Sequence, residues 1–105
     1  MSRSTRGREQ IVAPVAATFA ATPFDVGQCL AFDVVFQVDS GATATFTITD
    51  DEDTAMNGAV SLTGLTASKR LSFAPGEFSG TTLKVACTSY SGAGNVGVRL
   101  DRLER

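Results

Sequence analysis

Residues 28–50 read QCLAFDVVFQVDSGATATFTITD, and this stretch decides the fold. Its first half alternates apolar side chains with other residues, at Leu30, Phe32, Val34, Phe36 and Val38. Its second half alternates them with threonine, at Ala42, Ala44, Phe46 and Ile48. A period of two is typical of a strand that buries one face. Because the turn residues Asp39-Ser40-Gly41 separate the two runs, the pattern predicts a β-hairpin at the centre of a small all-β domain.

The rest of the chain repeats this pattern in shorter runs, which turn residues separate. The runs fall at 11–20, 59–63, 69–74, 81–88 and 95–100. With the two central runs they predict an antiparallel β-sandwich of about seven short strands, either immunoglobulin-like or jelly-roll-like. Residues 1–10 show no such period, so we expect an extended basic N-terminal arm there, followed by a single β-sandwich domain over residues 11–105.

The length of 105 residues and the hydrophobic fraction of 43% suit one globular domain with its own core. No stretch approaches the ~20 consecutive apolar residues of a membrane span, so we expect no membrane contact. The apolar run from Ile11 to Ala21 is interrupted by Pro14, which does not fit a cleaved signal peptide. We therefore expect synthesis in a host cytoplasm, where Cys29 and Cys87 would remain thiols.

Positive charge is concentrated at the start of the chain. Three arginines fall within the first eight residues, whereas six basic residues stand against 11 acidic ones in the rest. A basic arm on an acidic body suits docking onto another molecule, although a merely solvated polar tail is an equal alternative. The residues expected to bind a partner are Arg3, Arg6, Arg8, Ile11 and Val12.

The sequence offers no catalytic or cofactor-binding set. It contains no histidine, which removes the Ser-His and Cys-His nucleophile pairs and the usual zinc sites. Neither cysteine belongs to a CxxC pair, and the glycine-rich run 91–94 lacks the lysine of a phosphate loop. The lysines and arginines beyond the arm are scattered and the phenylalanines fall at core positions, so no nucleic-acid face is expected. We expect neither an enzyme nor a bound cofactor.

The one carboxylate cluster is the run 50–53, which reads DDED. Aligned as a calcium loop from Asp51, it places Met56 where glycine is required and Leu62 where the bidentate acid should be. We therefore expect an exposed, metal-free loop. A calcium site of another kind at the end of a sandwich stays open as an alternative.

Residues 71–85, LSFAPGEFSGTTLKV, resemble the hairpin of Calx-β domains, in which a strand ending in Phe-x-Pro-Gly-Glu leads into a return strand. The resemblance implies an immunoglobulin-like sandwich. It does not reach the acidic calcium ligands of that family, because Ala86-Cys87-Thr88 follow the return strand. The spacing of the two cysteines is also similar to that of the immunoglobulin disulfide. The tryptophan and tyrosine that accompany that disulfide are absent here, so we expect no bond between the two cysteines.

Over its whole length, the chain resembles the small decoration or cement proteins of tailed-bacteriophage heads, which are Ala-, Thr-, Gly- and Val-rich β domains of this size with docking arms. This resemblance implies a virion structural protein that binds the major capsid protein or other virion proteins and stabilises the head. It also implies a homo-oligomer in the assembly, with the arm as a clamp. The alternative is a carbohydrate- or calcium-binding β-sandwich module. The absence of tryptophan and the single Tyr90 count against a sugar platform.

Overall fold

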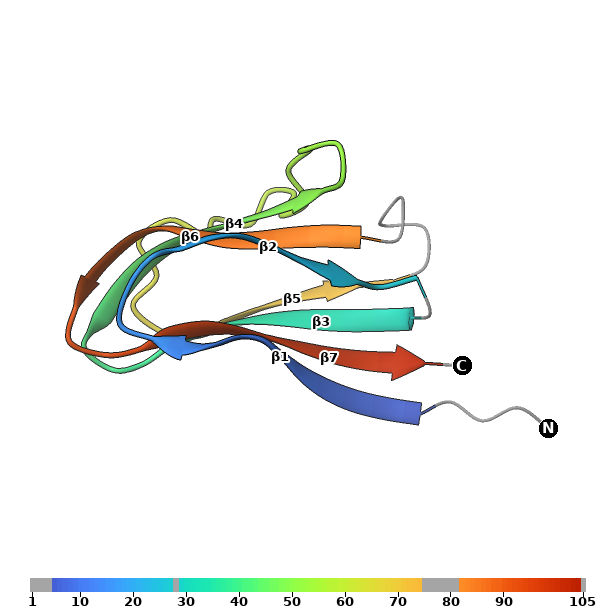
Figure 1. The fold of residues 1–105 in the computed structure, drawn as a ribbon, viewed down its shortest axis with the longest axis horizontal. Helices are drawn as coiled ribbons and strands as arrows, with labels where there is room; N and C mark the ends of the chain where they lie inside the picture. The colour runs from blue at the N-terminus through green and yellow to red at the C-terminus, as the bar shows by residue number, and fades with distance from the viewer. Residues whose placement is uncertain (1–4, 28, 75–81, 105) are drawn as a thin grey trace.

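The computed structural model describes residues 5–27, 29–74 and 82–104, which form two antiparallel sheets packed as a sandwich (Figure 1). The seven strands are β1 (Thr5–Val15), β2 (Phe19–Asp25), β3 (Cys29–Val38), β4 (Ala42–Asp50), β5 (Lys69–Phe73), β6 (Thr82–Gly92) and β7 (Val96–Glu104). One sheet has four strands in the order β1-β7-β3-β5, and the other has three in the order β2-β6-β4. The predicted all-β sandwich is therefore confirmed. Within the described residues there is no helix long and apolar enough to cross a membrane.

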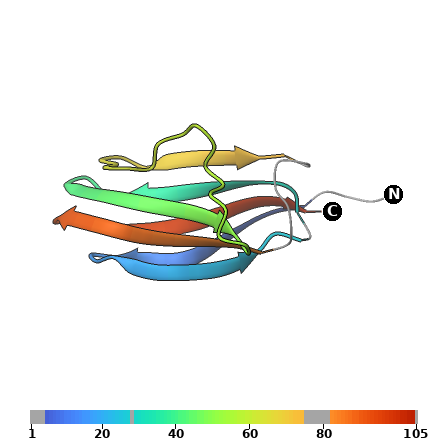
Figure 2. The ribbon, with the colours of Figure 1, turned by 90° about the horizontal axis from the view of Figure 1, so that it is seen from above.

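Every step from one strand to the next along the chain crosses from one sheet to the other (Figure 2). This alternation is the topology of a jelly roll, whereas consecutive strands of an immunoglobulin fold often pair as hairpins. A complete jelly roll has eight strands. The segment 51–68 stands in for the missing one, because it runs beside β4. Ala44 and Leu65 exchange backbone hydrogen bonds of 3.0 and 2.7 Å, and the Phe46 amide donates to the Leu62 carbonyl at 3.0 Å.

The central β-hairpin predicted from residues 28–50 is wrong, although its turn and its buried face are right. β3 pairs with β5 and β7, and β4 pairs with β6, so the turn at Asp39-Ser40-Gly41 joins two sheets. A period of two shows which face is buried, but it does not show whether the next strand lies beside or opposite. Here it lies opposite, and the rings of Phe36 and Phe46 meet across the core with centroids 5.1 Å apart.

The predicted burial phase is confirmed on both sides of this turn. The inward side chains of β3 and β4 are at most 6% exposed, namely Phe32, Val34, Phe36, Val38, Ala42, Ala44, Phe46 and Ile48. The side chain of Leu30 lies outside the described residues. Two phenylalanines of neighbouring strands, Phe32 of β3 and Phe73 of β5, stack with centroids 4.8 Å apart. Apolar area removed from water on these two inner faces is the main stabilising contribution to the sandwich.

The hairpin implied by the Calx-β resemblance is also wrong, because β5 belongs to the four-stranded sheet and β6 to the three-stranded one. The turn expected at residues 75–77 lies outside the described residues. Residues 59–63 form no strand, although Leu62 is 3% exposed in the core. The run 11–20 is split between β1 and β2, which lie in different sheets. Periodicity alone could not resolve such changes of sheet.

The N-terminal region differs from the predicted arm. Residues 5–10 belong to β1 and pair in regular register with residues 104–99 of β7. Residues 1–4 lie outside the described residues. An edge strand needs backbone partners more than an apolar period, because the amide and carbonyl groups of its neighbour must be satisfied. A polar sequence such as TRGREQ can therefore occupy the edge of the four-stranded sheet.

Candidate interaction surface

Among the described strands, β1 forms an edge of the four-stranded sheet and pairs with β7 alone. Of the five predicted partner-binding residues, Arg3 and the side chain of Arg6 lie outside the described residues. Arg8 points to solvent, with a side chain 73% exposed. Ile11 and Val12 are half-buried and pack against the core. Of the predicted side chains that the structure describes, Arg8 alone is thus free to meet a partner, and the two apolar residues fix β1 to the sandwich.

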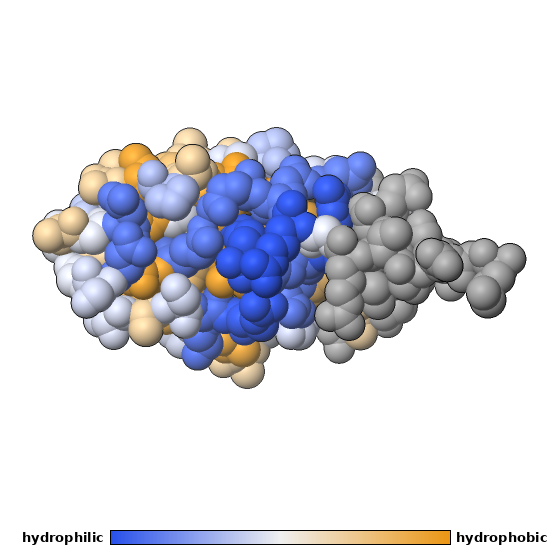
Figure 3. Space-filling view, turned by 90° about the horizontal axis from the view of Figure 1, so that it is seen from below, coloured by the Kyte–Doolittle hydropathy of each residue, from blue (hydrophilic) through white to orange (hydrophobic). Residues whose placement is uncertain are grey.

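The outer face of the four-stranded sheet carries a compact group of charges, seen as the hydrophilic band in Figure 3. Register places Arg8, Asp101 and Asp33 in one row across β1, β7 and β3. Like charges directly opposite each other on neighbouring strands are destabilising. Arg70 compensates the two aspartates, since its Nη1 donates to Asp33 Oδ2 at 2.6 Å and lies 3.3 Å from Asp101 Oδ2. Arg99 adds a bidentate pair to Asp101 at 2.9 and 3.1 Å.

This arginine–aspartate cluster (Arg8, Asp33, Arg70, Arg99 and Asp101) was not predicted, because its members looked scattered along the chain. The signal that could have found it is their phase. Asp33, Arg70, Arg99 and Asp101 each fall at an outward position of a strand whose alternate residues form the core, whereas Arg8 lies in a stretch without such a period. Only the cross-strand register brings them together, and register is not encoded in any one of the strands.

The ion pairs and hydrogen bonds within the cluster favour the charged forms of Asp101 and Arg70. Partial burial would raise the pKa of Asp101, but the hydrogen bonds and charge of Arg99, with the charges of Arg8 and Arg70, outweigh it and leave that pKa below its ordinary value. The hydrogen bond to Asp33 is the main cause that raises the pKa of Arg70. Both groups therefore remain charged at neutral pH.

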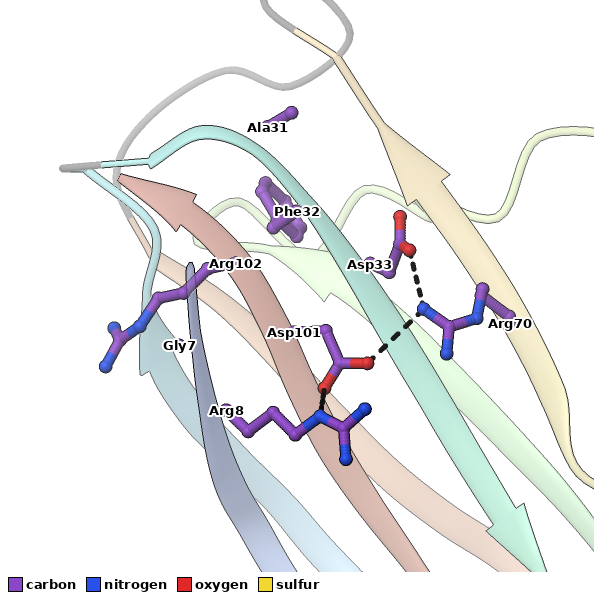
Figure 4. Close-up of a pocket in the computed structure, with 8 residues that line it drawn as sticks. All are labelled: Gly7, Arg8, Ala31, Phe32, Asp33, Arg70, Asp101 and Arg102. Atoms are coloured by element: carbon purple, nitrogen blue, oxygen red, sulfur yellow. Dashed lines mark hydrogen bonds and ion pairs between the residues drawn. The ribbon is translucent and has the colours of Figure 1, made fainter. Parts of the chain in front are cut away.

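A hollow of about 520 Å³ opens beside the cluster (Figure 4). Its lining consists of Gly7, Arg8, Ala31, Phe32, Asp33, Arg70, Asp101 and Arg102. The hollow remains open because Gly7 and Ala31 are too small to fill it. Arginine side chains lie on either side of Asp101. Guanidinium groups with unused donors recognise carboxylates and phosphates well, because two parallel N–H groups match two oxygens.

The acidic run 50–53 is exposed as predicted, except for its first residue. Asp50 is 6% exposed, and its Oδ1 accepts hydrogen bonds from the amides of Glu52 and Thr54, both at 2.9 Å. Asp53 adopts a φ of 63° and accepts a hydrogen bond of 2.5 Å from Lys84 Nζ. Among the described residues there is no group of three or more His, Cys, Asp or Glu placed to hold a metal ion. A metal-free loop stays a prediction.

Cys87 is a free, buried thiol in β6, in agreement with the expectation that it forms no disulfide. Its Sγ donates to the Ser89 carbonyl at 3.3 Å, and burial raises the pKa of the thiol above its ordinary value. The side chain of Cys29 lies outside the described residues. Because its thiol is buried and its pKa is raised, Cys87 reads as a small core residue and not as a reactive group.

Tyr90 does not form an exposed aromatic platform. It is half-buried against the core, and its hydroxyl donates to the Gly94 carbonyl at 2.6 Å. The ring therefore supports the connection between β6 and β7. No feature of this residue favours the carbohydrate-binding alternative.

The end of the sandwich that holds the β1–β2, β3–β4 and β6–β7 connections is nearly free of charge (left in Figure 1). The stretches 10–24, 34–49 and 85–98 contain one charged residue between them, Asp39, whose Oδ2 accepts from the Asn95 amide at 3.2 Å. Residues 13–17 (APVAA) are all exposed there, and Val15 is 38% exposed. Charge depletion and exposed apolar atoms are typical of the core of a protein interface.

No family model matches the chain, and no curated protein matches it. Among solved structures, the chain is similar to the crystal structure of the SPBc2 prophage-derived protein YomS, with a TM-score of 0.64 and 14% identity. That match covers 99% of this chain and 97% of the other, so the two share one fold from end to end. A second match, to the structure of the infectious bursal disease virus Gx strain, covers 95% of this chain and 29% of the other. It is 18% identical, and its TM-score of 0.34 is too low to support a shared fold.

Proposed function

We propose that this protein is a structural component of a bacteriophage particle that decorates the head by binding the surface of a preformed shell. The observation that carries the proposal is the end-to-end match of its jelly roll to a prophage-derived protein. The jelly roll also recurs in viral capsid proteins. This support is an analogy of fold, and the residues must supply the mechanism.

The docking element that we assign is β1 with the residues that follow it. The outer edge of β1 presents backbone donors and acceptors to which a strand of a shell protein can add. At its end, residues 13–17 offer an exposed surface without charge. The clamp expected over residues 1–12 is thereby revised for residues 5–12, which belong to the edge strand β1.

Co-sedimentation with phage heads tests this proposal. Val15→Asp and Ala17→Asp place a charge on the docking surface at exposed positions, so they should weaken attachment by on the order of tenfold or more while the melting temperature stays unchanged. Thr47→Asp is the matched control, since Thr47 is exposed on β4 in the other sheet. Deleting residues 2–10 would be a poorer test, because it also removes the partners of residues 99–104 in β7.

Two results would count against the proposal. Attachment of both aspartate variants at the wild-type level would exclude this docking element. Failure of the wild-type protein to sediment with any head would exclude decoration itself.

A further inference from the structure

The largest cluster of acidic residues in this protein is the run at the end of β4 and the start of the following loop. Four of its 11 acidic residues stand in the run 50–53. The buried Asp50 carboxylate holds the loop backbone, and Lys84 pairs with Asp53. The carboxylates of Asp51 and Glu52 are exposed, and no side chain of the described residues pairs with either. They are thus presented to solvent on a backbone that is already ordered, which lowers the entropy lost on binding.

The hollow on the opposite sheet has the complementary chemistry. Arg8 is held only by an ion pair of 3.7 Å from its Nε to Asp101, which leaves its terminal N–H groups in solvent. Arg70 uses Nη1 for both aspartates, and its other nitrogens contact no acceptor among the described residues. Its side chain is 47% exposed. Two guanidinium groups therefore border a space of about 520 Å³ with donors to spare.

We propose that Asp51 and Glu52 of one copy of this chain bind Arg8 and Arg70 of a second copy. The loop projects from the side of the three-stranded sheet, and the hollow lies on the outer face of the four-stranded sheet (Figures 1 and 4). Among the described residues no ion pair joins Asp51 or Glu52 to Arg8 or Arg70 within one chain. The contact joins two different surfaces. Made reciprocally by two copies it closes a two-fold dimer, and made head to tail it builds a ring or an open row of copies.

Charge complementarity selects a second copy as the occupant. The chain carries a formal charge of −2, and the run 50–53 contributes −4 of it, so the remainder, which includes the three N-terminal arginines, is positive. The contact between free copies is weak, because exposed ion pairs contribute little and salt screens them. Copies held side by side on a surface would meet at a high effective concentration. The association is measured on the free protein, so its failure would leave the proposed head binding untouched.

Sedimentation velocity at low and high salt tests the proposal on the full chain. Wild type should associate at low salt and dissociate at high salt. The hollow variant, Arg8→Glu, and the loop variant, Asp51→Lys with Glu52→Lys, should each associate on the order of tenfold more weakly or not at all. Both replace exposed side chains, and a thermal melt verifies that they fold. Lys69→Glu is the charge-matched control for Arg8→Glu, since Lys69 is exposed on the same sheet and does not line the hollow.

Mixing the two variants gives the decisive result. An equimolar mixture retains one intact loop and one intact hollow, so it should associate more tightly than either variant does alone. Wild type that stays monomeric at low salt, a mixture that stays monomeric, or association lost equally in Lys69→Glu would each overturn the proposal. Association of wild type only with an added acidic peptide would assign the hollow to another protein.

Discussion

Asp101 illustrates how a single residue can tie one sheet face together. Its pKa is below the ordinary value, so its ionised form stabilises the folded state above about pH 4, and this contribution is lost as the pH falls through the folded pKa. Asp101→Asn should lower the free energy of unfolding at neutral pH by about 1–2 kcal/mol. The difference from wild type should shrink as the pH falls. Urea denaturation at several pH values measures both effects.

The exposed Asp51 supplies the control for that experiment. No side chain of the described residues pairs with it, so Asp51→Asn should change stability little at any pH. A wild-type-like stability of Asp101→Asn at neutral pH would show that the arginines do not depend on this carboxylate.

Phe46 should be among the most sensitive core positions. It is 3% exposed and its ring meets Phe36 at 5.1 Å and Phe19 at 6.2 Å. Phe46→Ala should destabilise the protein by about 3–5 kcal/mol, because it leaves a cavity between the sheets. Phe19→Ala should have a smaller effect, since Phe19 is half-buried. Equal effects of the two changes in chemical denaturation would contradict this ranking.

At the level of the elements, β1 is held close to β7 because Gly97 lacks a side chain. A Cβ at Gly97 would lie 2.8 Å from the Val12 carbonyl oxygen and 3.1 Å from Gln37 Oε1, near the register shift between Gln10 and Val12. Gly97→Ala should destabilise the protein by about 1–3 kcal/mol and accelerate amide hydrogen exchange in β1. Gly7→Ala is the control, because its Cβ would approach nothing closer than 3.7 Å. Unchanged exchange in β1 for Gly97→Ala would refute this role.

The elements also show why part of the fold could be predicted from the sequence and part could not. The side chains of β3 and β4 that face the core could be predicted, because alternate residues of a strand point to opposite faces of the sheet. The pairing partners of those strands could not be predicted. The same alternation occurs in two strands of one hairpin and in two strands that face each other from different sheets. The turn at residues 39–41 suited both cases. Residues 5–10 carried no period at all, because their place in the sheet rests on backbone bonds to β7.

For the whole molecule, the candidate surfaces depend on contacts between distant parts of the chain. Arg8, Arg70 and Arg99 lie in three different strands, and only the order β1-β7-β3-β5 gathers them around Asp101. Sequence reasoning found Arg8 through its charge and missed the other two. The uncharged end is different, because its charge depletion is visible in the sequence. The uncharged stretches lie together at one end of the molecule only because of the connections between the two sheets.

The same topology governs how the chain folds. No two of the seven strands that are consecutive pair with each other, so each sheet requires contacts between distant residues, and the pairing of β4 with the segment 51–68 is local. Folds with non-local pairing refold on the order of milliseconds to seconds. Phe36 and Phe46 face each other across the core, so Phe36→Ala and Phe46→Ala should slow refolding by similar factors in stopped-flow experiments. Refolding in microseconds would contradict the expectation from non-local pairing. Slowing by only one of the two changes would indicate that one sheet forms before the other.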